Sequence, residues 1–307
     1  SEAHRKDCYM PVLHYSNCPS CRCENLKPAL NAIDHTVSHE SFAIWECDRC
    51  SLRFTQDVPD EGSIGPYYKS DSYISHSNTS KGFVNSLYHM VRRETLAEKY
   101  RLVASATRLK QGKLLDIGAG TGAFVGYMQG CGWEVTGLEP DASARSVART
   151  DNEVQLLDIG QLFSLTPDGF DAITLWHVLE HVHDLHGYME QLKKLIRRSG
   201  RIFIAVPNYT CYDASVYREN WAAYDVPRHL YHFSPMAMQT LVVGHELQLL
   251  GSQPMWYDSF YISLLSEKYR GNGRGNMLRA GVNGLVSNAK AFVNKSRCSS
   301  LIYVISK

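Results

Sequence analysis

The stretch "KLLDIGAGTGAF", residues 113–124, constrains the fold more than any other part of the chain. It begins as a short apolar strand, continues through Gly118, Gly120 and Gly122, and leads into the helical pattern "AFVGYMQGCG". Glycines permit a tight turn and let a ligand approach the backbone, while the helix N-terminus offers free N–H groups. The stretch therefore predicts the first strand–loop–helix unit of an open α/β sheet that binds a nucleotide-like ligand.

A second strand, "WEVTGLEP", ends at Glu139, where a carboxylate can accept hydrogen bonds from ribose hydroxyls. A dinucleotide site makes nearly the same prediction, because G-x-G-x-x-A followed by an acidic residue is also permitted for NAD. Asp116 separates the two interpretations, since a carboxylate at the strand end suits a cationic ligand and disfavours a pyrophosphate. S-adenosylmethionine carries an ammonium and a sulfonium and has no phosphate, so it is the favoured ligand.

Here the sequence resembles the class I S-adenosylmethionine-dependent methyltransferases, whose first motif, acidic-x-G-x-G-x-G, matches residues 116–122. The resemblance continues through "VQLLDIGQL", expected as a third strand, "GFDAITLWHVLEHV" and "GRIFIAVPN". It implies a Rossmann-like α/β fold with a seven-stranded sheet and an antiparallel last strand. The expected cofactor-binding residues are Asp116, Gly118, Ala119, Gly120, Gly122, Glu139, Pro140, Asp158, Ile159 and His177. Independently of the resemblance, Tyr73 and His76 in "SDSYISHS" are expected to close over the cofactor from the N-terminal side.

The segment "WHVLEHVHDLH" contains H-x-x-E-H, the string of inverted zinc proteases. That site needs a helix and a third ligand, whereas here the string follows a strand and forms a loop and first helical turn. The segment also resembles the ubiquinone-biosynthesis O-methyltransferases, in which carboxylates and a histidine can hold a divalent cation near a catechol. His177 stands here in place of an acid. The alternative is that His177 and Glu180 shape the methionine pocket while His181 caps a helix or packs.

Six of the nine cysteines lie in the first fifty residues, and four of them form the paired knuckles "CPSC" and "CDRC". Two C-x-x-C pairs joined by a β-hairpin are typical of a closed, structural zinc site. A redox dithiol needs only one such pair. Cys8 and Cys23 are spare, and Cys23 complicates the choice of second ligand. The predicted zinc ligands are Cys18, Cys21, Cys47 and Cys50.

Charge and hydropathy limit the partners of the chain. The formal charge is only +1, so no overall field favours nucleic acid, and the basic residues of the helical pattern in residues 81–109 are expected to be a solvated face. No apolar run is long enough to span a bilayer and no secretion signal is evident, so the expected location is the cytoplasm. The expected units are a zinc ribbon over residues 1–60, a linker with amphipathic helices over 61–110 and a methyltransferase domain over 111–307.

After the fifth strand, an aromatic insertion at about residues 208–240 is expected to build the acceptor pocket. Its "PRHLYHFS" resembles the E-H-x-x-Y-F-S motif of zinc-ribbon deoxysugar C-methyltransferases, but Arg228 replaces the glutamate and His232 the tyrosine. Histidine suits proton removal near neutral pH. The candidate bases are His181, His229 and His232, each of which has a purely structural role as its alternative.

The sequence thus predicts a methyltransferase that uses S-adenosylmethionine, with a structural zinc, and methylates a hydroxyl or carboxyl of a small molecule, lipid or glycan intermediate. An RNA-modifying enzyme and a catalytically silent docking module are the alternatives. The sequence does not specify the oligomeric state. A basic, partly helical excursion over residues 270–297 is expected to contact acceptor, partner or lipid headgroups, or to be a solvated insertion.

Overall fold

The computed structural model describes residues 12–69, 83–271 and 276–307, with the backbone alone over 83–92. Its centre is a twisted sheet in the order β11-β12-β9-β8-β6-β7. Strands β6, β7, β8 and β9 are parallel, whereas β12 runs antiparallel to both of its neighbours. The predicted α/β class and the antiparallel last strand are therefore confirmed. The strands are β6 (Lys113–Ile117), β7 (Glu134–Leu138), β8 (Phe170–Trp176), β9 (Ile196–Pro207), β11 (Gln248–Pro254) and β12 (Ser300–Ser306).

The strand count differs from the predicted seven, because this sheet has six strands within the described ranges. The expected third strand, "VQLLDIGQL", forms only an isolated parallel bridge between Leu157 and Leu138. Asp158 then caps the 3-10 helix η3 (Ile159–Ser164) by accepting a hydrogen bond from the Gly160 N–H. The cap turns the chain away before a strand can extend, since a side chain that satisfies local backbone donors competes with strand pairing.

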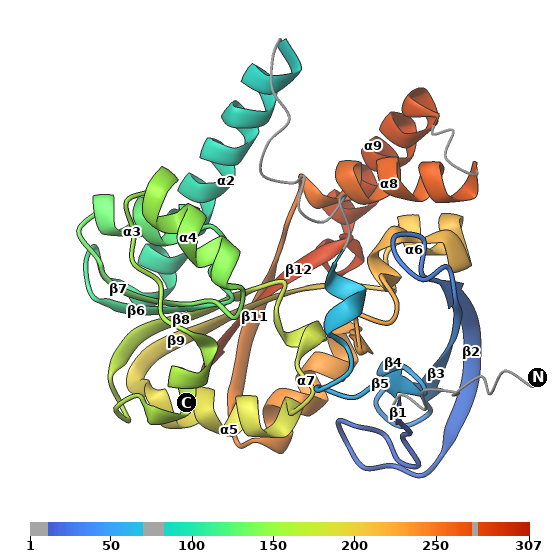
Figure 1. Ribbon diagram of the computed structural model, residues 1–307, viewed down its shortest axis with the longest axis horizontal. Helices are drawn as coiled ribbons and strands as arrows, with labels where there is room; N and C mark the ends of the chain where they lie inside the picture. Colours follow the sequence, from blue (N-terminus) through green and yellow to red (C-terminus); the bar gives the residue numbers. More distant parts are fainter. Residues whose placement is uncertain (1–11, 70–82, 272–275) are drawn as a thin grey trace, which may run out of the picture.

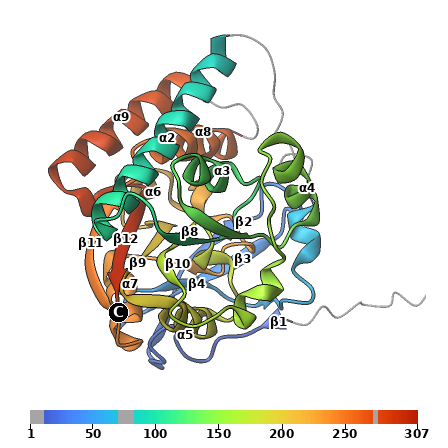
Figure 2. The same cartoon turned by 90° about the vertical axis from the view of Figure 1, so that its left-hand side faces the viewer.

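Helices cover both faces of the sheet (Figures 1 and 2). Most of them begin at a capping side chain: Asp141 caps α4, Asp184 caps α5 and Ser234 caps α7, each accepting from backbone N–H groups of the first turn. The helical pattern after residue 81 forms one long helix, α2, which ends before β6. These elements are α2 (Phe83–Thr107), α3 (Ala123–Gly130), α4 (Ala142–Asp151), α5 (Leu185–Leu195) and α7 (Pro235–Gly244).

The N-terminal region forms a second sheet in the order β10-β4-β3-β2. Strands β2 (Leu26–Ile33) and β3 (Ser41–Cys47) are the hairpin between the two cysteine knuckles, and β4 (Arg53–Thr55) follows. The fourth strand, β10 (Tyr231–His232), comes from the distant insertion and pairs antiparallel with β4. The predicted boundaries at 60 and 110 stay predictions, but the ribbon and the insertion share one sheet.

Short elements connect these layers. Strands β1 (Val12–Leu13) and β5 (Val58–Pro59) pair, and 3-10 turns occur at η1 (Gly65–Tyr68), η4 (Leu179–His181), η5 (Arg218–Asn220), η6 (Ala222–Tyr224) and η7 (Lys295–Arg297). Helix α6 (Tyr212–Tyr217) lies in the insertion, and α8 (Asp258–Arg270) and α9 (Met277–Val293) form the excursion before β12. Within the described ranges, no helix is both long and apolar enough to cross a membrane.

Candidate functional site

The glycine loop lies between β6 and α3 and has the left-handed backbone that its glycines permit. Gly118, Gly120 and Gly122 have φ angles of +72°, +55° and +75°. A Cβ at Gly118 would lie 2.4 Å from Val178, and one at Gly122 would lie 2.4 Å from Val154. A Cβ at Gly120 would meet nothing within 4 Å. Two glycines therefore serve internal packing, while the third leaves the backbone open toward the space above the loop.

Glu139 lies directly beside this loop. Its Oε2 accepts a hydrogen bond from the Gly120 N–H at 2.8 Å, and its Oε1 accepts one from the Asp141 N–H at 2.9 Å. Burial raises the pKa of this carboxyl, against the lowering effect of the two N–H groups. Each oxygen keeps a free lone pair, so the carboxylate is held in place and can still accept from a ribose.

Asp116 lies at the end of β6, where its side chain is only 1% exposed and accepts a hydrogen bond from the Thr174 hydroxyl at 2.6 Å. Burial raises its pKa to about 7, although Thr174 and the nearby Lys99 both act to lower it. A carboxylate held in this way gains from a cation brought beside it. The buried, incompletely neutralised Asp116 thus fits a cationic ligand.

Lys99 was not predicted as a site residue. It comes from α2, and its Nζ lies 4.4 Å from the centre of the Trp176 ring. Burial lowers its pKa, against the attraction of Asp116 and Asp258. It helps to line a cavity of about 370 Å³ over the glycine loop. The other lining residues are Thr95, Leu96, Asp116, Gly118, Ala119, Gly120, Thr121, Ala123, Phe124 and Trp176.

The remaining predicted cofactor contacts are placed less directly. Arg145 of α4 forms an ion pair with Asp158 at 3.0 Å and donates to the Pro140 carbonyl at 2.9 Å, so it holds the β7 exit against the turn at Ile159. The Asp158 side chain is exposed to solvent. Tyr73 and His76 lie outside the described residues.

His177 follows β8 with a φ of +57°, an uncommon conformation for a residue with a side chain. Its Nε2 lies 2.9 Å from Asp258 Oδ2, and its Nδ1 lies 3.3 Å from Glu180 Oε1. Burial alone would lower its pKa, but the two carboxylates raise it to about 10. His177 is therefore a cation held between carboxylates at the strand exit, a state in which it has no lone pair for a metal.

His181 and His229 face each other, with ring centres 4.6 Å apart. His181 Nδ1 lies 3.1 Å from both the Tyr68 hydroxyl and the Arg228 carbonyl, and His229 Nδ1 lies 2.8 Å from the Ala223 carbonyl. A carbonyl only accepts, so each Nδ1 carries a hydrogen, and the lone pair of the neutral His181 ring lies on Nε2. Burial and the adjacent His229 lower the pKa of His181 to about 4.

Glu180 completes this group. It is fully buried, and its Oε2 has no hydrogen-bond partner among the described residues. Glu180, His181 and His229 each offer one ligand atom, and the three atoms lie within 4.8 Å of one another. The atoms that these three side chains turn toward one another can accept hydrogen bonds, and none of the three side chains donates a hydrogen bond to another. A substrate hydroxyl, a proton on one ring or a metal cation could satisfy them.

His232 occupies a different position. Its Nε2 lies 3.0 Å from the Thr55 hydroxyl of β4, and its ring packs edge-on against Tyr224. Burial is the main cause that lowers its pKa well below the usual value. The sequence grouped His232 with the other two candidates, and its catalytic role stays a prediction. The structure places it in the shared sheet, with its Nε2 already engaged.

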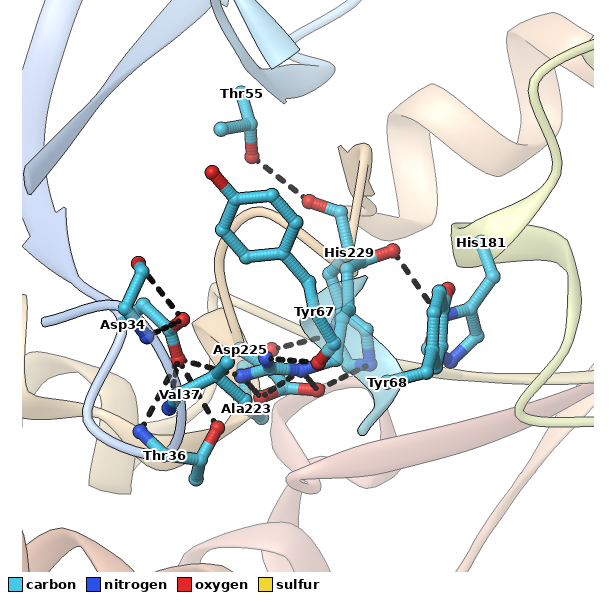
Figure 3. A network of polar contacts seen from close by, with 12 residues as sticks. Asp34, Thr36, Val37, Thr55, Tyr67, Tyr68, His181, Ala223, Asp225 and His229 are labelled. Atoms are coloured by element: carbon cyan, nitrogen blue, oxygen red, sulfur yellow. Dashed lines mark hydrogen bonds and ion pairs between the residues drawn. The ribbon is translucent and has the colours of Figure 1, made fainter. Parts of the chain in front are cut away.

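Arg228, 2% exposed, links the ribbon to this site. Figure 3 shows the network of polar contacts that runs from Asp34 of the ribbon to Asp225 and His229. It donates to Asp34 at 3.0 Å, to Asp225 at 2.6 Å and to the Tyr67 carbonyl at 2.8 Å. Asp225 Oδ2 in turn lies 3.9 Å from His229 Nε2. Apart from the departure from the sugar methyltransferase motif at Arg228, no sequence pattern predicts this arrangement.

The four predicted zinc ligands come together. Cys18 Sγ lies 3.6 Å from Cys50 Sγ, Cys21 Sγ lies 3.6 Å from Cys47 Sγ, and all four sulfurs lie within 4.8 Å of one another. Tetrahedral zinc with Zn–S distances of about 2.3 Å requires similar separations. Cys23 is outside this cluster and contributes its carbonyl, which accepts from the Cys18 N–H. The cluster could hold a metal.

Comparison with known proteins agrees with this geometry. A family model described as a methyltransferase domain matches residues 88–250. A ubiquinone biosynthesis O-methyltransferase of Glaesserella parasuis is 36% identical over 109 residues, which are 32% of this chain and 46% of that protein. One of Xanthomonas campestris is 25% identical over 169 residues, which are 51% of this chain and 71% of that protein.

The chain spans about half the length of the first of these relatives. Among solved structures, 1,6-didemethyltoxoflavin-N1-methyltransferase of Burkholderia thailandensis is similar at a TM-score of 0.48 and 16% identity, over 90% of this chain and 99% of that one. The family model covers more than half of the chain. The chain therefore belongs to the methyltransferase domain family.

Proposed function

We propose that this methyltransferase acts on the oxygen of a small-molecule or lipid-borne acceptor and uses a histidine as the base. The observation that carries the proposal is the pair of His181 and His229, whose ring centres lie 4.6 Å apart and which each offer one nitrogen within 4.8 Å of a Glu180 oxygen. The names of the relatives, which are O-methyltransferases, support an oxygen acceptor. An already ionised carboxyl acceptor would not need the base.

The cofactor fits the cavity above the glycine loop. S-adenosylmethionine supplies a methyl group on a positively charged sulfur. Gly120 leaves its backbone open, Glu139 would accept from the ribose, and Asp116 would face the positive charge. Lys99, in the same cavity, would hold the carboxylate of the methionine part. Asp116 and Lys99 would thus match the positive and the negative charge of the ligand, while Gly120 and Glu139 would serve its uncharged ribose part.

The neutral state of His181 suits the role of base. Because its pKa is lowered to about 4, the ring is unprotonated at neutral pH and can accept the proton of a hydroxyl that lies near Nε2. Glu180 would stabilise the charge that then develops on the His181 ring, since a carboxylate nearby favours the protonated form. Alignment of the acceptor with the methyl group supplies the rest of the rate.

A divalent cation on Glu180, His181 and His229 is the second candidate for this place. The unpartnered Glu180 Oε2 favours it, because a buried carboxylate oxygen normally has a donor or a cation. His177, which the sequence associated with such a site, is bonded to Asp258 instead. Binding of Mn²⁺, measured by electron paramagnetic resonance on the zinc-loaded chain, distinguishes the two. A metal would be lost in His229→Ala, whereas a base requires none.

We also propose that the ribbon cysteines hold one structural zinc. Four thiolate ligands close the coordination shell, so this metal would stabilise the fold and take no part in methyl transfer.

The function is tested by incubating the purified chain with S-adenosylmethionine and metabolite extracts, and by mass spectrometry for products that gain a methyl group. The expected product carries the methyl on oxygen. A product methylated only on carbon or nitrogen would overturn the choice of acceptor atom. A methylated tRNA instead of a small molecule would restore the RNA-modifying alternative.

A further inference from the structure

Helix α9 presents its large apolar side chains outward and its small ones inward. Leu278, Val282, Leu285 and Phe292 are all exposed, at 85%, 58%, 62% and 81%. Their spacing of four, three and seven residues places them on one face of the helix. The buried face consists of Ala280, Gly284, Ser287 and Ala291. A helix of a water-soluble surface normally has the opposite arrangement, with the large apolar residues inside.

Helix α8 shows the same arrangement in part. Phe260 and Leu264 are exposed and Ser259, Ser263 and Ser266 are buried, although Ile262 is buried as well. The two helices pack closely, because a Cβ at Gly284 would lie 2.7 Å from the Phe260 ring. Figures 1 and 2 show the α8–α9 hairpin at the periphery of the molecule, on the same side as α2. The hairpin therefore carries an apolar face that the described part of the chain leaves uncovered.

The charge is one-sided from the last residues of α8 onward, whereas α8 itself contains Asp258 and Glu267, and Glu267 pairs with Arg279 at 3.6 Å. Residues 268–307 contain eight lysines and arginines and no aspartate or glutamate. The whole chain has a formal charge of only +1, so residues 1–267 are net acidic. Arg279 lies on α9 itself, and Lys295 and Arg297 follow its end. An apolar face bordered by cations is complementary to a surface with an anionic outer layer and an apolar layer beneath it.

We propose that the α8–α9 hairpin docks this enzyme on an anionic lipid bilayer, with the exposed face of α9 in the boundary between headgroups and acyl chains. A second copy of the chain is the less suitable occupant, because pairing two such hairpins would bring the cations of residues 268–307 together. The net acidic remainder would face away from the membrane. The proposal stands apart from the proposed function, since it concerns the location of the enzyme and not its acceptor.

The hairpin also lies beside the cofactor region. A cavity of about 230 Å³ is lined by Thr95 and Lys99 of α2, by Trp256 and Asp258 at the beginning of α8, and by Lys295 after α9. Thr95 and Lys99 also line the cavity over the glycine loop. Docking would therefore place the membrane next to a cavity that adjoins the cofactor site.

The test is sedimentation of the full chain with vesicles of phosphatidylcholine, with or without phosphatidylglycerol. Binding is expected with the anionic vesicles only and should weaken as salt is raised. The variant Leu285→Glu/Phe292→Glu should lower the vesicle affinity at least about tenfold, because two charges would enter the apolar boundary. Arg279→Gln/Arg297→Gln should lower it for anionic vesicles and reduce its salt dependence.

The matched control is Met236→Glu/Val243→Glu, which adds the same charge at two exposed apolar positions on α7, each 56% exposed. This control should bind vesicles as the unchanged chain does, and all variants should keep their affinity for S-adenosylmethionine. Failure to bind anionic vesicles, or equal losses in the α9 and α7 variants, would overturn the proposal. So would a dimer in sedimentation velocity that Leu285→Glu/Phe292→Glu separates, because a second copy would then cover the face.

Discussion

Asp116 gives the cofactor site a pH dependence at the scale of a single residue. Its pKa of about 7 means that the carboxyl is protonated below that pH and loses its attraction for a cation. Affinity for S-adenosylmethionine should be constant above pH 7 and should fall by up to about tenfold per pH unit below it. Calorimetry across this range measures the effect. Asp116→Asn should bind more weakly with a flat profile, and a flat profile in the unchanged chain would contradict the assignment.

The histidine pair gives a second prediction for single residues. His181→Gln or His229→Gln should lower turnover about 100-fold or more, while the affinity for S-adenosylmethionine stays within a few-fold. Because the pKa of His181 is about 4, turnover should fall only as the pH drops toward 4. His183→Gln, a nearby histidine bonded to the Pro59 carbonyl, is the control. His232→Gln should mainly lower stability, through loss of the Thr55 contact. Near-normal turnover in both His181→Gln and His229→Gln would favour alignment alone.

The residues that the sequence located are those fixed by local chemistry. A positive φ requires glycine in the loop, and the ends of parallel strands meet at one edge, so Asp116, Gly120 and Glu139 could be placed together from sequence alone. Lys99 and Asp258 could not, because each reaches the site from an element whose packing depends on the whole fold. The same limit explains His232, which lies close in sequence to His229 but is turned toward β4 by strand pairing.

At the scale of elements, residue patterns predicted α2 and the knuckle hairpin, and the family resemblance implied the antiparallel end of the sheet. The resemblance also implied a third strand that Asp158 replaces with a capped turn. An apolar run of this length is compatible with either outcome, and the decision depends on one side-chain hydrogen bond. The type of an element can therefore be predicted from sequence where its pattern is long. The prediction becomes ambiguous where one helix-capping side chain competes with the pairing of a short strand.

The ribbon provides a prediction for an element. One zinc per chain should copurify with the unchanged protein, and Cys47→Ser should lose it, because the remaining three thiols no longer close the shell. Elemental analysis measures the metal, and limited proteolysis measures the loosening of residues 12–59. Cys23→Ser, which alters a cysteine outside the cluster, should keep the metal. Full retention of zinc in Cys47→Ser would contradict the assignment.

At the scale of the whole molecule, a buried ion pair joins the ribbon to the catalytic domain. Arg228 lies between Asp34 of the ribbon and Asp225 of the insertion, and β10 continues the ribbon sheet. Sequence could not reveal this connection, since Asp34 and Arg228 are far apart in the chain and neither belongs to a motif that predicts pairing. The ribbon therefore supports the insertion segment that carries His229. Loss of the proposed ribbon metal should consequently disturb the site around His229 as well.

This coupling can be measured through stability. Removing one partner of a buried pair typically costs about 3–5 kcal/mol, so Asp34→Ala should lower the free energy of unfolding in denaturant by an amount near the lower end of that range. Arg228 and several N–H donors hold the pKa of Asp34 below its usual value, against the effect of burial. The stabilisation is therefore present above the unfolded pKa of about 4 and is lost as the pH falls below it.

The variant pair Asp34→Ala and Arg228→Met tests whether the two side chains act together. Their effects on the free energy of unfolding should be less than additive, because each change removes the same interaction. Glu94→Ala, which breaks an exposed pair with Arg101, should leave stability nearly unchanged. Asp34→Ala should also reduce turnover more than it reduces cofactor affinity, since Arg228 orients Asp225 beside His229 while the glycine loop is remote from this network. Additive effects, or a loss of cofactor affinity equal to the loss of turnover, would mean that the ribbon is merely attached and does not support the acceptor side.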